Sequence, residues 1–187
     1  MINELIKNRR SIFPSSYDPS RPIDRELLEQ LVENANWAPT HRLTEPWRFQ
    51  VFHTPESRQE LGQYLANYYK NHTPPALFAP SQYDKALESP VKAGAVIAII
   101  LQRDMDARVP EFEEIAAVAM AVQNMWLTCT EMGLGCYWST PKSALEATEW
   151  LNLEEGQRCL GLFYIGWHNA PDLPGKRGDI EKKTLWR

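Results

Sequence analysis

The sequence of 187 residues is poor in cysteine and has no cysteine pairing pattern. Cys129, Cys136 and Cys159 are odd in number and lie in apolar stretches. An odd set of thiols without a spacing motif argues against a disulfide framework. We therefore expect three reduced thiols in the core of a cytoplasmic protein.

Long hydrophobic runs and excess positive charge are also missing. The longest apolar run, residues 93–101, is too short to cross a bilayer, and the first seven residues lack the apolar core of a signal peptide. The net charge of −4 gives no basis for binding nucleic acid through its phosphates. The expected protein is therefore soluble, with no membrane partner and no nucleic-acid partner.

Several motifs of common enzyme chemistries are absent as well. The sequence contains no Gly-x-Gly-x-x-Gly, P-loop or Gly-x-Ser-x-Gly pattern, which excludes the usual nucleotide loops and the hydrolase elbow. His41, His53, His72 and His168 have neither metal-ligand spacing nor cysteine partners, so no metal site is expected. If the protein is an enzyme, a cofactor carries the chemistry.

The strongest pattern that is present is a long apolar helix. From Glu111 to Met132, apolar residues recur at steps of three and four, and alanines fill much of the remaining circumference. Pro110 and three nearby glutamates favour a helix start, and Gly133 favours its end. A helix of this length spans about 33 Å, so it should cross most of the domain as a buried central helix.

The other elements define the fold class. Strands are predicted at Arg48–His53, Ala95–Leu101, Gly135–Trp138 and Cys159–Trp167, and further helices near Asn3–Asn8, 24–38, Glu56–Lys70, Tyr83–Lys92 and Ala144–Leu151. There is no regular βαβ alternation. We expect one domain, residues 1–187, of the α+β class, with a mixed or antiparallel sheet flanked by helices.

Two short segments invite a functional interpretation. Arg9-Arg10-Ser11 could clamp a phosphate, because guanidinium groups offer forked donors and the serine adds a third. The alternative is a solvated arginine pair at a helix end. The segment 39–47 is polar and precedes a core strand, which is a common place for a site.

Taken together, these segments resemble a known family. The motifs are Arg9-Arg10-Ser11, the stretch 38–47 with its two prolines, the end of the long helix at 132–135, Trp138-Ser139 and Lys176-Arg177. Their order and separations resemble the FMN-dependent nitroreductase family. The chain is most similar to its short, minimal branch of NAD(P)H nitroreductases, and the resemblance covers nearly the whole sequence.

The resemblance implies a homodimer with FMN at the subunit interface and NADH or NADPH as reductant. Arg9, Arg10 and Ser11 would bind the phosphate and ribityl oxygens, and Lys176 and Arg177 would approach the same phosphate. His41 and Arg42 would reach the flavin from the partner subunit, and Trp138 and Ser139 would line its other side. For Trp138, packing in the core is the alternative.

Two positions depart from the family pattern. Phe13 stands where many members have a Lys or Arg near the flavin, and a cation there stabilises the negatively charged reduced flavin. His41 or Arg42 could substitute for that cation. Glu45 stands where Gln or Asn is usual, and a carboxylate close to the flavin would oppose reduction unless it faces solvent.

The implied mechanism is ping-pong hydride transfer from NAD(P)H, through N5 of FMN, to a small conjugated acceptor such as a nitroaromatic or a quinone. No side chain is needed as a nucleophile or base, because the flavin carries the chemistry. Two alternatives are a flavin-binding protein without enzymatic activity and an enzyme that fragments reduced flavin with oxygen.

Overall fold

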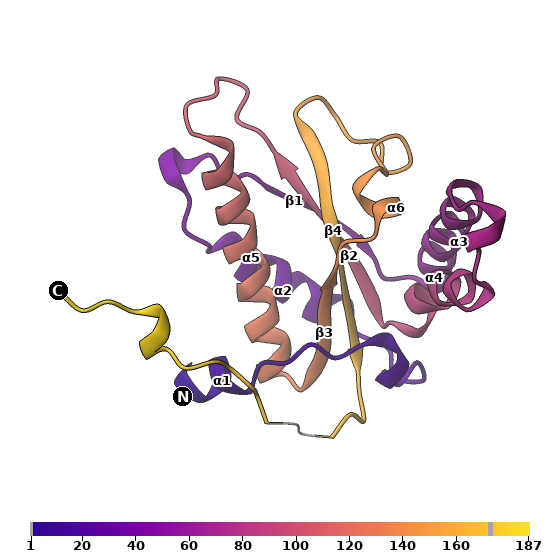
Figure 1. Cartoon of the computed structure of the whole chain (residues 1–187), viewed down its shortest axis with the longest axis horizontal. Helices are drawn as coiled ribbons and strands as arrows, with labels where there is room; N and C mark the ends of the chain where they lie inside the picture. Colours follow the sequence, from indigo (N-terminus) through magenta and orange to yellow (C-terminus); the bar gives the residue numbers. More distant parts are fainter. Residues whose placement is uncertain (1, 172–173) are drawn as a thin grey trace.

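The fold is built on an antiparallel sheet of four strands with helices on both faces (Figure 1). The structure, a computed structural model, describes residues 2–171 and 174–187. The strand order is β1-β2-β4-β3, so β3 is an edge strand. This arrangement confirms the α+β class and the expected four strands. The strands are β1 (Trp47–Phe52), β2 (Ala95–Gln102), β3 (Leu134–Ser139) and β4 (Gln157–Trp167).

The helices form two layers, with α2 and α5 on one side of the sheet and α3, α4 and α6 on the other (Figure 1). The helix α1 lies near the C-terminal end of α5. The α-helices are α1 (Ile2–Asn8), α2 (Arg25–Asn36), α3 (Pro55–His72), α4 (Pro80–Lys92), α5 (Glu111–Glu131) and α6 (Lys142–Leu145). Four short 3-10 helices are η1 (Pro14–Ser16), η2 (His41–Leu43), η3 (Pro75–Leu77) and η4 (Glu181–Lys183). None of the helices within residues 2–171 and 174–187 has both the length and the apolar character to cross a membrane.

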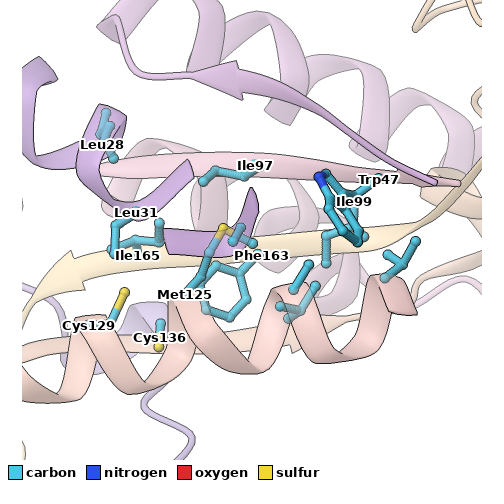
Figure 2. Packing of buried hydrophobic residues seen from close by; sticks show 14 of the residues in the cluster. Leu28, Leu31, Trp47, Ile97, Ile99, Met125, Cys129, Cys136, Phe163 and Ile165 are labelled. Carbon is cyan, nitrogen blue, oxygen red and sulfur yellow. The ribbon is translucent and has the colours of Figure 1, made fainter. Parts of the chain in front are cut away.

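The core is divided by β2, whose apolar run is buried on both faces, as predicted. Ile97 and Ile99 pack with α2 and α5, whereas Val96 and Ala98 pack on the opposite side with α3. Successive side chains of a strand point to opposite faces, so one continuous apolar run serves two separate clusters. Figure 2 shows the α5 side of this core, where Met125 lies beside Phe163.

The helix α5 confirms the predicted central helix but is not covered all round. Met125 and Cys129 are fully buried against the sheet, whereas Phe112 and Met120 are 69% and 40% exposed. The exposed apolar side chains recur at helical spacing and form an apolar stripe along the outer face, which consists of Phe112, Ala116, Ala119 and Met120. Removing such an apolar stripe from water lowers the free energy. The stripe is therefore a candidate contact surface for a covering partner that the single chain does not supply.

Two predicted helices differ from the observed ones. The helix α4 begins at Pro80 rather than at Tyr83, because proline is well suited to the first turn of a helix. The helix α6 covers only Lys142–Leu145, and the chain then continues to Leu151 mainly through turns. All three cysteines are buried and free, as predicted, and burial raises the pKa of the Cys136 thiol.

A buried carboxylate fixes the start of α5. Glu114 is 1% exposed and accepts a hydrogen bond of 2.9 Å from the backbone N–H of Asp104. Its second oxygen forms an ion pair with Arg103, whose side chain is 26% exposed. This contact joins the loop that follows β2 to the first turn of α5, where a negative charge is also favoured by the helix dipole.

The substitution Glu114→Ala should destabilise the fold, because it leaves Arg103 and the Asp104 N–H without their partner. We expect a loss of about 3 kcal/mol, the lower end for breaking a buried pair, since Arg103 is partly exposed. Urea denaturation at a fixed protein concentration measures it. The control is Glu111→Ala on the same helix, which breaks an exposed pair with Arg158 and should cost less than about 1 kcal/mol. Equal losses in both variants would contradict the structural role of Glu114.

Candidate functional site

The segment that follows α1 wraps around the free edge of β3. Arg9 lies on the α5 side, where its guanidinium group stacks over the Trp126 ring at 4.5 Å. The backbone N–H of Ile12 donates to the carbonyl of Cys136 in β3, at 3.1 Å. Phe13 then reaches the opposite side of the sheet and contacts Tyr137, with ring centroids 4.9 Å apart. Residues 9–13 therefore connect the two faces of the sheet.

Both predicted cationic motifs meet at the beginning of this segment. The guanidinium group of Arg10 packs on the backbone of Gly175 so closely that a Cβ at Gly175 would overlap it. Arg10 also donates to the carbonyl oxygens of Lys7 and Arg9, at 2.5 and 2.7 Å. The next two residues of the tail are Lys176 and Arg177. The tail thus brings Arg177, with Lys176 next to it in sequence, close to Arg9 and Arg10, although the two motifs are far apart in sequence.

The electrostatics of this cluster favour an anion. Partial burial lowers the pKa of Arg9, and the nearby positive charges of Arg177 and Arg10 lower it further. Within the described ranges, no carboxylate pairs with Arg9, Lys176 or Arg177, and the hydroxyl of the neighbouring Ser11 has no hydrogen-bond partner there. Clustered like charges repel one another, so an anion with several oxygens would stabilise the arrangement. We call Arg9, Arg10, Lys176 and Arg177 the cationic cluster.

The far end of β3 carries the second predicted pair. The indole N–H of Trp138 donates to the carbonyl of Leu160 in β4 at 3.0 Å, and its ring packs against the α5 side of the core. The Trp138 side chain is thus held by packing. The backbone of Trp138 should nevertheless face the free edge, because Cys136, two residues earlier, points its carbonyl to Ile12.

Ser139 lines a cavity on the opposite face of the sheet. The cavity has a volume of about 340 Å³ and lies between α3, α4 and the segment from β3 to α6. This volume falls in the range of small-molecule sites. Its wall is aromatic and cationic, and the lining residues include Tyr68, Tyr69, His72, Lys85, Tyr137 and Lys142.

The predicted residues His41 and Arg42 lie elsewhere. They belong to η2, beside the N-terminal end of α5, where Nδ1 of His41 lies 2.5 Å from Oε2 of Glu113. Arg9 contacts Trp126, thirteen residues further along the same helix, which corresponds to about 20 Å of helix length. A single chain therefore keeps η2 apart from the cationic cluster (Figure 1).

The backbone of the η2 segment is strained. Arg42, Leu43 and Glu45 have φ values of 52°, 53° and 43°, in the left-handed region that costs a residue other than glycine on the order of 1 kcal/mol or more. The hydroxyl of Thr40 stabilises the segment by accepting a hydrogen bond from the Glu45 N–H at 3.2 Å. Leu43 is 79% exposed at its tip. Backbone strain in an exposed segment is more typical of a contact site than of a simple connection.

The sequence did not reveal the cavity residues on α3 and α4. Tyr68, His72 and Lys85 lie outside every recognised motif, and they come together at the cavity only when α3 and α4 pack against each other. One signal was present: Gln82, Lys85 and Ser89 recur at steps of three and four, and all three line the cavity. In the described part of the chain, no group of three or more His, Cys, Asp or Glu side chains is placed to hold a metal ion.

The comparisons with known proteins identify the family. The family model described as the nitroreductase family matches residues 6–167, and the chain belongs to this family. A relative from Bacillus subtilis, named "Putative NAD(P)H nitroreductase YfhC", is 24% identical over 186 residues, which cover 98% of this chain and 90% of YfhC.

Solved structures show the same fold. A nitroreductase-like family protein from Bacillus cereus superposes with a TM-score of 0.82 at 24% identity, covering 100% of this chain and 96% of the other. A mutant of the FMN and NADPH-dependent nitroreductase NfnB from Sphigopyxis sp. strain HMH gives a TM-score of 0.80 at 18% identity, with coverage of 100% and 99%. The expected family and fold are confirmed.

The cationic cluster should bind inorganic phosphate. At a phosphate concentration of about ten times Kd, binding stabilises the folded protein by about 1.4 kcal/mol, which corresponds to a rise in Tm of about 3–6 °C. The variant Arg9→Ala should raise Kd about tenfold or more, because a hydrogen bond to a charged group contributes about 1.5–3 kcal/mol. Thermal unfolding of ligand-free protein in increasing phosphate, with sodium chloride at matched ionic strength, measures both quantities.

The matched control for this experiment is Arg21→Ala. Arg21 also stacks on a tryptophan, Trp167, at 4.1 Å, so its removal loses a similar ring contact at a position outside the cationic cluster. Its phosphate response should equal that of the wild type. An undiminished phosphate response in Arg9→Ala would exclude Arg9 from an anion site.

Proposed function

We propose that the protein is an FMN-dependent oxidoreductase that transfers hydride from NADH or NADPH to a small conjugated acceptor, such as a nitroaromatic or a quinone, by a ping-pong mechanism. Membership of the nitroreductase family supports the reaction class. The observation that carries the proposal is the cationic cluster, in which Arg9, Lys176 and Arg177 have no carboxylate partner within the described ranges. The FMN phosphate bears nearly two negative charges and fits this cluster.

The residues present fit FMN at both of its ends. Arg9, Arg10, Ser11, Lys176 and Arg177 would hold the phosphate and the neighbouring ribityl oxygens. From there, residues 9–13 cross the β3 edge, a path of about 13 Å at most for four extended residues, and Phe13 reaches Tyr137, which lines the same cavity as Ser139. FMN carries its phosphate and its ring system at opposite ends of a five-carbon chain, so one molecule can reach both places.

The protein then orients the reaction and does not supply a reactive side chain. FMN supplies the redox chemistry when it is bound, because its N5 accepts a hydride and the ring system holds the two electrons for the acceptor. The backbone of Trp138 at the strand edge and the hydroxyl of Ser139 would hold the ring system in place. A single exposed face of the ring would receive NAD(P)H and the acceptor in turn, which is the basis of the ping-pong order.

We further infer that the active form is a homodimer with FMN at the interface. Two features of the single chain support this inference. The apolar stripe of α5 is exposed, and η2 lies at the end of α5 that is remote from the cationic cluster. A two-fold axis across α5 would cover both stripes. It would also bring His41 and Arg42 of each chain towards the cofactor of the other.

The C-terminal tail agrees with this arrangement. Ile180, Leu185 and Trp186 are 68%, 74% and 88% exposed, and the tail extends away from the rest of the chain (Figure 1). Apolar side chains on an extended tail are stabilised when they pack on a second subunit. A dimer of this kind would belong to the obligate class, whose interfaces bury on the order of 2,000 Å² or more.

The first test of the proposal is the visible spectrum of the purified protein. We expect a yellow protein with non-covalently bound FMN that loses its oxidised-flavin absorbance when NADH or NADPH is added without oxygen. An acceptor such as a quinone should restore the absorbance. Flavin that binds but resists reduction by both nucleotides would instead favour a flavin-binding protein without enzymatic activity. Loss of the flavin on admission of oxygen would favour the fragmentation reaction.

The second test concerns the apolar stripe of α5. The wild type should sediment as a dimer, and Met120→Glu should weaken the dimer at least tenfold, because two carboxylates would be buried without partners. The matched control is Met105→Glu, which changes an exposed methionine outside α5 and should leave the dimer intact. A wild-type monomer loaded with flavin would be inconsistent with the proposed interface.

A further inference from the structure

The N-terminal segment places no charged side chain at the cavity wall near residue 13. Phe13 is apolar, and its ring contacts Tyr137, which lines the cavity. Ser139, two residues further along β3, lines the same cavity. The cations in the wall come from other elements: Lys85 from α4 and Lys142 from the start of α6.

These two lysines differ in their electrostatic surroundings. Nζ of Lys142 lies 3.5 Å from Oε1 of Glu146, and the same carboxylate accepts a hydrogen bond from the hydroxyl of Tyr68. The ion pair of Lys142 and Glu146 therefore carries no net charge. Lys85, by contrast, has no carboxylate partner among residues 2–171 and 174–187. The polar α4 side chains that line the cavity beside it, Gln82 and Ser89, are uncharged.

We propose that Lys85 is the positioned cation of this cavity and that it stabilises the negative charge that bound FMN acquires on reduction, a role for which residue 13 is unsuited. This inference rests on the proposed function. A hydride carries two electrons and one proton, so NAD(P)H becomes NAD(P)⁺ and the flavin gains one negative charge. A cation in the same cavity lowers the energy of the reduced form more than that of the oxidised form, which raises the reduction potential.

The cavity wall makes Lys85 better placed than the other candidates in the same chain. His41 and Arg42 lie beside the N-terminal end of α5, and Glu113 at 2.5 Å holds His41. The cationic cluster lies at the beginning of the segment 9–13 and would be neutralised by the phosphate. Lys85 remains as the cation of the cavity without a counterion in the described ranges, at the end where the ring system would bind.

The test is the two-electron potential of bound FMN, measured by anaerobic equilibration with a reference dye. In Lys85→Gln, the equilibrium constant for reduction should fall at least tenfold, which is a decrease of about 30 mV for a two-electron couple. Lys85→Arg keeps the charge. Its potential should therefore differ from that of the wild type by less than a third of the decrease seen in Lys85→Gln. The matched control is the double variant Lys142→Gln/Glu146→Gln, since it removes both charges of the ion pair in the same wall and leaves the net charge unchanged; its effect should also be below a third of that decrease.

Two outcomes would overturn the proposal. One is a decrease in Lys85→Gln that does not exceed the decrease in the double variant Lys142→Gln/Glu146→Gln. The other is a larger decrease in Arg42→Gln than in Lys85→Gln, which would assign the role to the loop of the partner subunit. Both require a wild type that binds FMN and is reduced by NAD(P)H. Failure of either condition would count against the proposed function and would be seen before any variant is compared.

Discussion

The packing of α5 on the sheet is the contact on which the rest of the structure depends. Its inner face contributes Met125 and Cys129 to the core, and its two ends each hold one candidate segment. Glu113 in its first turn forms a hydrogen bond with His41, and the ring of Trp126 in its last turns stacks with the guanidinium group of Arg9. Because β3 begins directly after α5, the helix also sets the position of the strand edge along which the cofactor is proposed to bind. A change in its register would displace all of these parts together.

The sequence predicted the elements whose periodicity is strong. The long helix was predicted from Glu111 to Met132 and is observed from Glu111 to Glu131, and the apolar run of β2 was correctly interpreted as a central strand. Weakly patterned segments were less predictable. The helix α4 was predicted to begin too late, because the proline at its first turn also suits a loop. Helical spacing likewise predicted the apolar circumference of α5, but it could not show which face the single chain leaves exposed.

The candidate site was predictable where charge and sequence motif coincide. Arg9, Arg10, Lys176 and Arg177 were named from the sequence, and the fold brings both motifs together through the contact of Arg10 with Gly175. Whether they bind phosphate stays a prediction. The cavity residues could not be found in this way, because Tyr68 and Lys85 come from two helices whose relative placement is a property of the packed fold. Periodicity shows that a residue lies on an inner face, but not what faces it.

Residue 13 is apolar in this chain, and the proposed cation of the cavity wall, Lys85, comes from α4 instead. A charge acts through its distance from the group that it stabilises and through the counterions around it, and not through its position in the sequence. A cation supplied by the N-terminal segment and one supplied by α4 can therefore reach the same cavity from different directions. With Phe13 packed on Tyr137, the segment 9–13 contributes to packing, and phosphate binding is the role proposed for its beginning. In the proposed arrangement, the charge that tunes the redox potential would depend on how α4 packs against α3 and η1, so that the potential of bound FMN would be a property of the tertiary fold.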